Sequence, residues 1–195
     1  DAYRQLREDG DAVRLPDIPA VRYADFIAGE LAALDDDTDA AYWRGITADY
    51  PTARIPAGWQ GSGAPTVTRA EVDLTARQER LRAFALTTGV PLNAVLHAVH
   101  LKVIGQLTGD AAYSSGLVCD ARPELAGADR LLGMFLNTVP FAHHRATGSW
   151  RDLARQVFDR EVELWPHRRY PVPAIQRTAG RRVVEPAVVR DSWRH

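Results

Sequence analysis

One apolar segment, residues 91–108, places the strongest condition on how this chain folds. Its apolar residues recur at helical spacing at Leu92, Val95, Leu96, Val99, Val103 and Leu107, and the stripe is widened by Ala98, Leu101 and Ile104. This spacing predicts a helix that starts at Pro91 and is apolar on most sides. Because such a helix is stable only when it is buried, other elements have to cover it. A chain of 195 residues is long enough to supply them.

The other segments predict the covering layers. Apolar residues at helical spacing predict helices over 23–34, 38–48, 75–88, 149–165 and 171–179. Short apolar or alternating runs predict strands over 66–74, 113–119, 137–141 and 187–195. Residues 1–9 are expected to be the last turns of a helix, and 51–65 an irregular loop that is either exposed, as we favour, or lies over a cleft. This order of elements predicts an α/β (α+β) layered sandwich.

Local patterns predict which faces are buried and how two helices begin. The expected inward residues of the helix at 23–34 are Tyr23, Phe26, Ile27, Leu31 and Leu34, and those of the helix at 149–165 are Leu153, Val157, Phe158, Val162 and Trp165. Capping-box spacing occurs at Thr75–Gln78 and at Ser149–Asp152. These pairs predict the first turns of the two helices.

The charge and cysteine content exclude several classes of protein. The 24 basic and 25 acidic residues leave a formal net charge of −1, which argues against nucleic acid as the main partner because that needs an excess of basic residues. No apolar run approaches the roughly 20 residues of a membrane span, so no membrane partner is expected. Cys119 is the only cysteine, which excludes an internal disulfide and fits a reducing, cytoplasmic setting.

Few residues offer catalytic chemistry by themselves, since the sequence contains no phosphate-binding glycine loop, nucleophile elbow or zinc-protease motif. His143 and His144 are candidate general bases, but we favour a polar turn after a strand. His97 and His100 are a candidate metal pair, yet no carboxylate or cysteine accompanies them nearby in the sequence. The acidic run 35–37 is a second metal candidate, for which a solvated helix cap is favoured.

Five short motifs occur in order along the chain. They read Y-A-D-F at 23–26, Y-W at 42–43, C-D-A-R-P-E-L at 119–125, G-M-F-L-N-T-V-P-F at 133–141 and H-R-R-Y-P at 167–171. Together they resemble the motifs of nonribosomal peptide synthetase condensation domains, which belong to the chloramphenicol-acetyltransferase-like superfamily. Four positions depart from the family's pattern: Cys119 and Asp120 replace Gly and Arg, and Arg168 and Arg169 replace Gln and Asp.

The resemblance implies one lobe of a two-lobed acyltransferase. Family members form an amide when an acceptor amine attacks a donor thioester, with both groups carried on phosphopantetheine arms through a tunnel between the lobes. The family's H-H-x-x-x-D-G motif, whose second histidine is catalytic, does not occur in this sequence, and Asp-Gly does not follow His143-His144. Residues 1–195 are therefore expected to be the C-terminal lobe alone, which has no catalytic residue or bound cofactor and is inactive in isolation. The implied partners are the N-terminal lobe, acyl or peptidyl carrier proteins and a neighbouring adenylation domain.

The resemblance also assigns candidate site residues, either at the substrate tunnel or in structural motifs. They are Tyr23, Asp25, Phe26, Arg122, Gly133, Asn137, Thr138, His167 and Pro171. Gly133 is expected to permit a close backbone approach, and Asp25 to accept hydrogen bonds rather than act as an acid or base. Asn137 either shapes the tunnel wall or, as we favour, is a purely structural amide. Arg122 and Arg168 are taken as surface arginines, with contact to a carrier-arm phosphate as the alternative.

Two other functions stay open on the sequence alone. One is an enzyme of the same superfamily that uses a soluble acyl-CoA or an alcohol acceptor. The other is a degenerate, non-catalytic lobe that recruits a partner. The altered H-R-R-Y-P stretch is the reason for considering this function.

Overall fold

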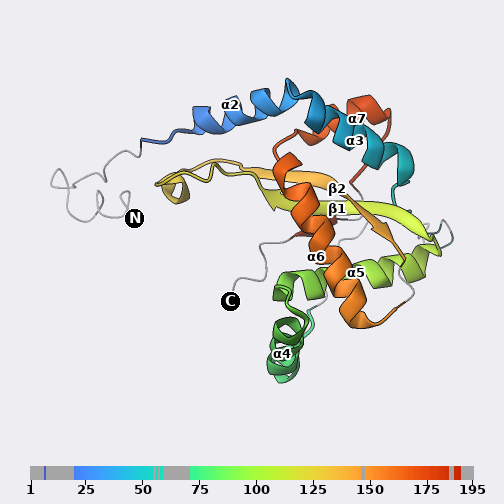
Figure 1. Cartoon of the computed structure of the whole chain (residues 1–195). Helices are drawn as coiled ribbons and strands as arrows, with labels where there is room; N and C mark the ends of the chain where they lie inside the picture. Colours follow the sequence, from blue (N-terminus) through green and yellow to red (C-terminus); the bar gives the residue numbers. More distant parts are fainter. Residues whose placement is uncertain are drawn as a thin grey trace.

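A three-stranded sheet in the order β2-β1-β3 forms the centre of the computed structural model (Figure 1), which describes residues 7, 20–54, 56, 58, 71–145, 148–184 and 187–189. Strands β1 (Ala112–Asp120) and β2 (Leu136–His144) are antiparallel and pair along their whole length. Strand β3 (Ala187–Val189) runs parallel to β1 on its other side. Nearly every residue of β1 and β2 is buried or half-buried, so both faces of the sheet are covered.

Helices cover the sheet in two groups (Figure 1). Helix α3 (Asp37–Asp49) packs beside α7 (Val172–Ala179), and both contact β2. Helix α5 (Leu92–Thr108) packs against α6 (Trp150–Leu164), which also contacts β2. Helix α4 (Gln78–Thr88) joins the second group, whereas α2 (Tyr23–Leu34) lies near α3. This arrangement confirms the predicted layered fold.

Helix α5 is buried as predicted, with Val95, Leu101 and Ile104 of the predicted stripe in the core, but part of the stripe is exposed. The side chains against the core include Ala94, His97 and Ala98, while Val99 and Val103 are 40% and 46% exposed. The reason is close packing against β1. A Cβ added to Gly105 would lie 3.2 Å from the ring of Tyr113, so small residues have to face the sheet here.

The apolar faces predicted for α2 and α6 are only partly buried. Phe26 is buried, but Ile27 and Leu31 on the same face of α2 are exposed, because α2 covers a small satellite cluster rather than the main core. In α6, Leu153 and Val157 are buried as predicted, while Val162 is 56% exposed. On the last turns of α6 the buried residues are Leu164 and a carboxylate, Glu161.

The two capping predictions have different outcomes. At Ser149, the hydroxyl accepts a hydrogen bond from the Asp152 N–H at 3.2 Å and the Asp152 carboxylate accepts one from the Ser149 N–H at 2.9 Å, which confirms the capping box. At Thr75 the prediction is wrong. There the Asp73 carboxylate accepts from the Thr75 N–H at 2.8 Å, and a short 3-10 turn, Thr75–Arg77, precedes α4.

Two further expectations need correction, and three lie outside the described residues. Residues 71–74 form no strand, and His143 and His144 end strand β2 instead of lying in a turn. The predicted helix at 1–9 apart from Arg7, most of the loop at 51–65 and residues 190–195 are not described. Within the described ranges no single helix is long and apolar enough to cross a membrane; only the bent pair Thr75–Thr88 and Leu92–Thr108, angled by 101°, reaches that length and composition together.

Candidate functional site

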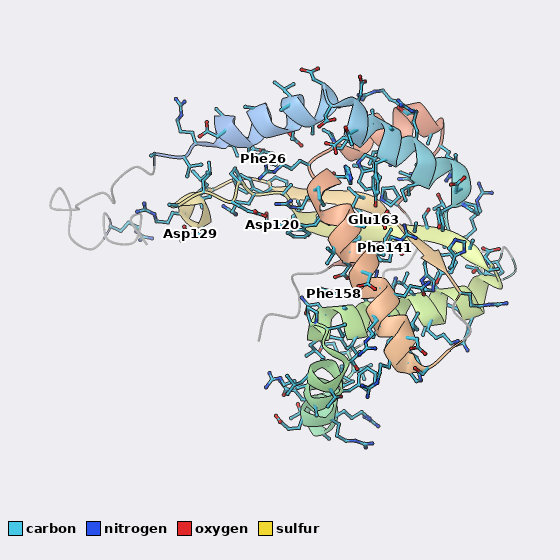
Figure 2. All side chains as sticks on the ribbon, viewed as in Figure 1. Phe26, Asp120, Asp129, Phe141, Phe158 and Glu163 are labelled. Atoms are coloured by element: carbon cyan, nitrogen blue, oxygen red, sulfur yellow. The ribbon has the colours of Figure 1, made fainter. Side chains whose placement is uncertain are left out.

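The sequence motifs meet at one end of the sheet, where β1 ends and β2 begins. Figure 2 shows Phe26 of α2 close to Asp120 at the end of β1, whereas Phe141 lies farther along β2. We call this region the motif junction. It comprises Tyr23, Asp25, Phe26, Asp39, Tyr42, Trp43, Arg122, Glu124, Gly133, Phe135, Asn137, Thr138, His167, Arg168, Arg169, Tyr170 and Pro171.

Asn137 links the sheet to the H-R-R-Y-P segment. Its Nδ2 donates hydrogen bonds to the backbone oxygens of Arg168 and Tyr170, both at 2.8 Å. Its Oδ1 accepts one from the Val172 N–H at 3.2 Å, at the start of α7. Because the side chain is buried and both its donors are used, Asn137 fixes the path of residues 168–172. Pro171 ends this path as the N-cap of α7.

His167 connects the same segment to α3. Its ring stacks on Tyr42, with centroids 4.0 Å apart and planes at 13°, and its Nδ1 bonds the Asp39 carboxylate. Its backbone oxygen accepts a hydrogen bond from the Trp43 indole at 3.2 Å. The Y-W and H-R-R-Y-P motifs are therefore neighbours in space. Asp39 was missed from the sequence, because only the fold brings it near the histidine.

Arg168, one of the positions that departs from the family pattern, is held inside the junction. Its guanidinium pairs with the Glu124 carboxylate, donates to the Trp165 backbone oxygen at 2.8 Å and lies 4.2 Å from the centroid of the Trp165 ring. Burial lowers the pKa of the Arg168 guanidinium, and the charge of Glu124 partly opposes that shift. These contacts make Arg168 an internal ion-pair partner of the R-P-E-L motif.

Arg122 closes the loop between β1 and β2. Its Nη1 donates to the backbone oxygens of Ala128 at 2.7 Å and Leu131 at 2.8 Å. Its guanidinium also lies 4.0 Å from the centroid of the Phe135 ring. Arg122 is thus occupied within the loop, as Arg168 is within the junction.

Tyr23, Phe26 and Phe135 form an aromatic cluster between α2 and this loop. The ring centroids lie 5.1–5.4 Å apart, and the Tyr23 hydroxyl donates to the Met134 backbone oxygen at 3.1 Å. A Cβ on Gly133 would lie 2.5 Å from the Tyr23 ring, so only glycine allows this approach. The cluster attaches α2 to the sheet.

Asp25 and Thr138 have different surroundings. The Asp25 carboxylate accepts a hydrogen bond from the Arg22 N–H at 2.7 Å, across the first turn of α2. Thr138 is half-buried and pairs with Val118 in the β1–β2 ladder. Asp25 therefore takes part in capping its own helix.

A small cavity of about 180 Å³ opens beside Asp25. It is lined by Asp25, Phe26, Gly29, Ala121, Pro123, Glu124, Leu125 and Arg169. Glu124 is already paired with Arg168, whereas the Arg169 side chain has no ion-pair partner among the described residues. Arg169 is therefore the cation at the junction that remains available to an anionic group.

The other candidate histidines lie away from the junction. His97 Nδ1 and Glu161 Oε1 are 2.8 Å apart in the core between α5 and α6. Burial lowers the pKa of the nearby His143 to about 4, with smaller effects from His97, His144 and Lys102. His144 Nε2 lies 2.7 Å from the Tyr50 hydroxyl. In the part of the chain that the structure describes, no three His, Cys, Asp or Glu side chains lie together in a group that could hold a metal ion.

Comparison with known proteins gives the class of this fold. A family profile described as "Condensation domain" matches residues 1–188. The chain is 36% identical over 169 residues to the AMB antimetabolite synthetase AmbE of Pseudomonas aeruginosa, a match that covers 86% of this chain and 8% of that protein. It is 25% identical over 181 residues to the malpinin synthetase of Mortierella alpina, a match that covers 91% of this chain and 2% of that protein.

Solved structures of condensation domains have the same fold as this chain. The first condensation domain of the CDA synthetase matches with a TM-score of 0.73 at 25% identity, over 96% of this chain and 42% of that chain. The condensation domain of the Monacolin K polyketide synthase MokA shares the fold, with a TM-score of 0.67 at 20% identity, over 96% of this chain and 45% of that chain.

The fold is that of the chloramphenicol-acetyltransferase-like proteins, which confirms the predicted fold class. The chain belongs to the condensation-domain family of the nonribosomal peptide synthetases, as its motifs indicated. It spans less than half of the solved condensation domain and less than a tenth of the curated synthetases described above.

Proposed function

We propose that this chain is the C-terminal lobe of a condensation domain that joins a carrier-bound acyl donor to a carrier-bound amine. In that reaction the amine nitrogen bonds to the thioester carbonyl carbon, the carbon–sulfur bond breaks, and the donor arm keeps a thiol after taking up the proton. The observation that supports this assignment is the family match over residues 1–188 in a chain that covers 42% of a solved condensation domain.

The proposed role of the lobe is to supply one wall of the substrate tunnel. The sequence contains no H-H-x-x-x-D-G motif, so we assign the catalytic histidine to an N-terminal lobe. The motif junction suits the role of a wall because Asn137 and Arg122 bond backbone oxygens and thereby hold its loops in place. Preorganised surroundings of this kind lower the cost of orienting a substrate.

We further propose that Arg169 meets the phosphate of a carrier arm. Arg122 and Arg168, the alternatives considered on the sequence, already bond backbone oxygens and lie over aromatic rings. Arg169 lines the 180 Å³ cavity, and its guanidinium has the charge and geometry that phosphate recognition requires. The chain itself binds no cofactor in this proposal, because the phosphopantetheine belongs to the carriers.

The test compares the chain alone with the chain joined to the N-terminal lobe of its parent reading frame. Both are supplied with carrier-loaded donor and acceptor, and the amide product is measured by mass spectrometry. We expect no amide from the chain alone and turnover from the joined protein. In the joined protein, Arg169→Gln should raise KM for the carrier about tenfold with little change in kcat, whereas Arg177→Gln, at an exposed position of α7, should change neither.

Each contrary result has a defined meaning. Amide formation by the chain alone that is lost in His144→Ala would overturn the assignment to a non-catalytic lobe. Turnover of the joined protein only with acyl-CoA donors or alcohol acceptors would favour the alternative acyltransferase. Absence of turnover with every donor, combined with capture of a carrier or tailoring enzyme, would favour recruitment. The cytoplasm is our expected location, because the single cysteine requires no oxidising compartment.

A further inference from the structure

A second and larger hollow lies between α4, α5 and the first turn of α6. Its volume is about 540 Å³, within the roughly 300–1,000 Å³ of typical small-molecule sites. Its lining consists of Arg77, Arg80, Leu81, Phe84, Val95, Val99 and Trp150. We call it the arginine groove. It contains none of the residues of the motif junction, and α4 lies at the far end of the molecule from α2, α3 and α7 (Figure 1).

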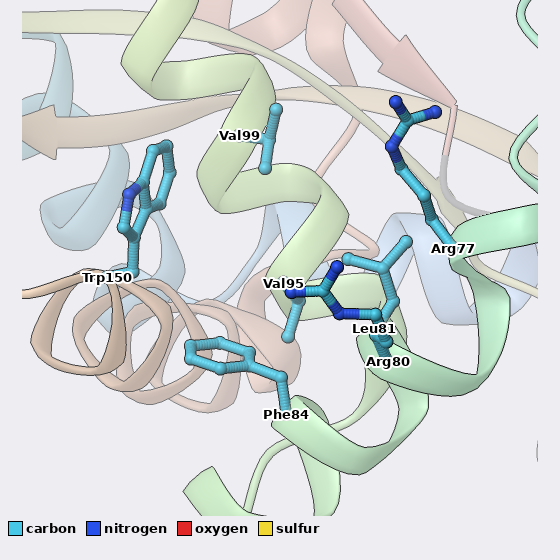
Figure 3. Close-up of a pocket in the computed structure, with 7 residues that line it drawn as sticks. All are labelled: Arg77, Arg80, Leu81, Phe84, Val95, Val99 and Trp150. Atoms are coloured by element: carbon cyan, nitrogen blue, oxygen red, sulfur yellow. The ribbon is translucent and has the colours of Figure 1, made fainter.

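The groove is lined by apolar side chains and by two arginines (Figure 3). Trp150 and Phe84 lie on one side, Val95 and Val99 of α5 form the floor, and Arg77 lies on the opposite side. The Arg80 guanidinium extends over the floor near Val95. No acidic side chain among the described residues lines the groove. The groove therefore combines apolar contact area with two positive charges.

The walls of the groove are fixed by two other arginines. Arg151 of α6 donates to the Thr87 backbone oxygen at 2.8 Å, and Arg155 of α6 donates to the Thr88 backbone oxygen at 3.1 Å. These bonds satisfy carbonyls that the last turn of α4 would otherwise leave unpaired. They hold α4 against α6, so the groove does not depend on a ligand for its shape.

Arg77 and Arg80, in contrast, have no ion pair or side-chain hydrogen bond with any described residue. Both positive charges are therefore open to an anion. Meanwhile Trp150 and Val99 remain 53% and 40% exposed, although burial of such side chains is favourable. A single ligand that carries both an anionic head and an apolar tail would contact both the arginines and the apolar lining.

We propose that the arginine groove binds a small amphiphile in which a carboxylate is carried on an apolar chain. The carboxylate accepts charge-assisted hydrogen bonds from Arg80 over the floor, and the Arg77 guanidinium adds positive charge from the side of the groove. The apolar chain lies along Val95 and Val99 toward Phe84 and Trp150. The groove shares no lining residue with the cavity at the motif junction, and its occupant is bound without any covalent step.

Decanoate is a suitable probe, and decyltrimethylammonium is its matched control because it has the same tail length and the opposite charge. Binding to the whole chain is measured by titration calorimetry, with the Trp150 indole N–H signal followed by NMR and assigned with Trp150→Phe. We expect decanoate to bind at least about tenfold more tightly than the cation. The double variant Arg77→Gln/Arg80→Gln should weaken decanoate binding about tenfold and remove the preference for the anion.

Two further variants locate the site. Arg82→Gln removes a cation from the same helix outside the groove, where Arg82 faces Glu79 at 4.0 Å, and should leave decanoate binding unchanged. Val99→Trp fills the floor and should weaken decanoate binding about tenfold by exclusion. Equal binding of decanoate and the cation, equal loss in Arg82→Gln and the double variant, or intact binding in Val99→Trp would each overturn the proposal. None of these results bears on amide formation, so the proposed function is tested separately.

Discussion

The motif junction and the arginine groove use arginine in opposite ways. In the junction, the guanidiniums of Arg122 and Arg168 donate hydrogen bonds to backbone oxygens and lie against an aromatic ring. Both arginines therefore hold loops of the protein in place. In the groove, Arg77 and Arg80 form no ion pair or side-chain hydrogen bond with a described residue and border apolar surface. A side chain's contacts, rather than its type, therefore separate a structural cation from one available to a ligand. Substitutions at the junction are expected to lower the stability of the chain, and substitutions of Arg77 and Arg80 are not.

The largest effect is expected at the centre of the junction. Asn137→Ala removes two buried hydrogen bonds to backbone oxygens and leaves the Val172 N–H without its acceptor. The free energy of unfolding should fall by about 3 kcal/mol, as measured by urea denaturation. Asn93→Ala on α5 is the control and should change it by less than about 0.5 kcal/mol. Similar values for both variants would contradict the central role of Asn137.

Acid should weaken the core between the two regions. His143 is buried on β2, where its pKa is lowered to about 4 from the ordinary 6.5. Burial likewise lowers the pKa of His100 on α5. The unfolded chain therefore binds protons first as the pH falls below about 6.5, and stability declines until the pH reaches the folded pKa. For His143 alone the loss between about pH 7 and pH 5 is about 2 kcal/mol.

Replacing the His143 imidazole tests whether this residue causes the predicted loss of stability at low pH. His143→Phe keeps a ring beside Tyr113, whose centroid lies 5.3 Å from that of His143. In this variant the unfolding free energy should fall less between pH 7 and pH 5 than it does in the original chain. An unchanged pH dependence would show that other groups cause the acid sensitivity, and would contradict the assignment to His143.

A third prediction concerns the glycine beneath Tyr23. Gly133→Ala places a methyl group 2.5 Å from the Tyr23 ring, and should destabilise the chain by about 2 kcal/mol. In a Tyr23→Ala background the same change should cost much less, which a double-mutant cycle measures. Gly45→Ala is the control, because its Cβ would meet nothing within 4 Å in α3 and should stabilise by up to about 1 kcal/mol. An equal loss of unfolding free energy with and without the Tyr23 ring would show that contact with Tyr23 does not cause the strain.

Much of the fold and the composition of the junction were predictable from the sequence. The helix Tyr23–Leu34 has the predicted bounds, because the apolar spacing that predicts it is a local pattern. The motifs were also recognised in order, and the structure brings them together. Recognition worked because each motif is short and contiguous.

Other features depend on contacts between distant segments, which no local pattern contains. The orientation of α5 follows from Gly105 meeting Tyr113, and the partners Asp39 and Glu161 are set by helix packing. The Thr75–Gln78 spacing failed for a related reason, since Asp73 supplies the same acceptor two residues earlier. The arginine groove was not predicted either, because Val99 in its floor was expected to be buried and three helices have to meet to form it.

The smallest effects on stability are expected at the arginine groove. They test directly whether Arg80 differs from the structural arginines of the motif junction. Arg155→Gln removes a hydrogen bond to the last turn of α4 and should lower the unfolding free energy by about 1 kcal/mol. Arg80→Gln, also in the groove region, removes no described bond and should change it by less than about 0.5 kcal/mol. A loss in Arg80→Gln as large as that in Arg155→Gln would mean that Arg80 is a structural cation, like those of the junction. The charge that we assign to a carboxylate ligand would then already have a partner within the protein.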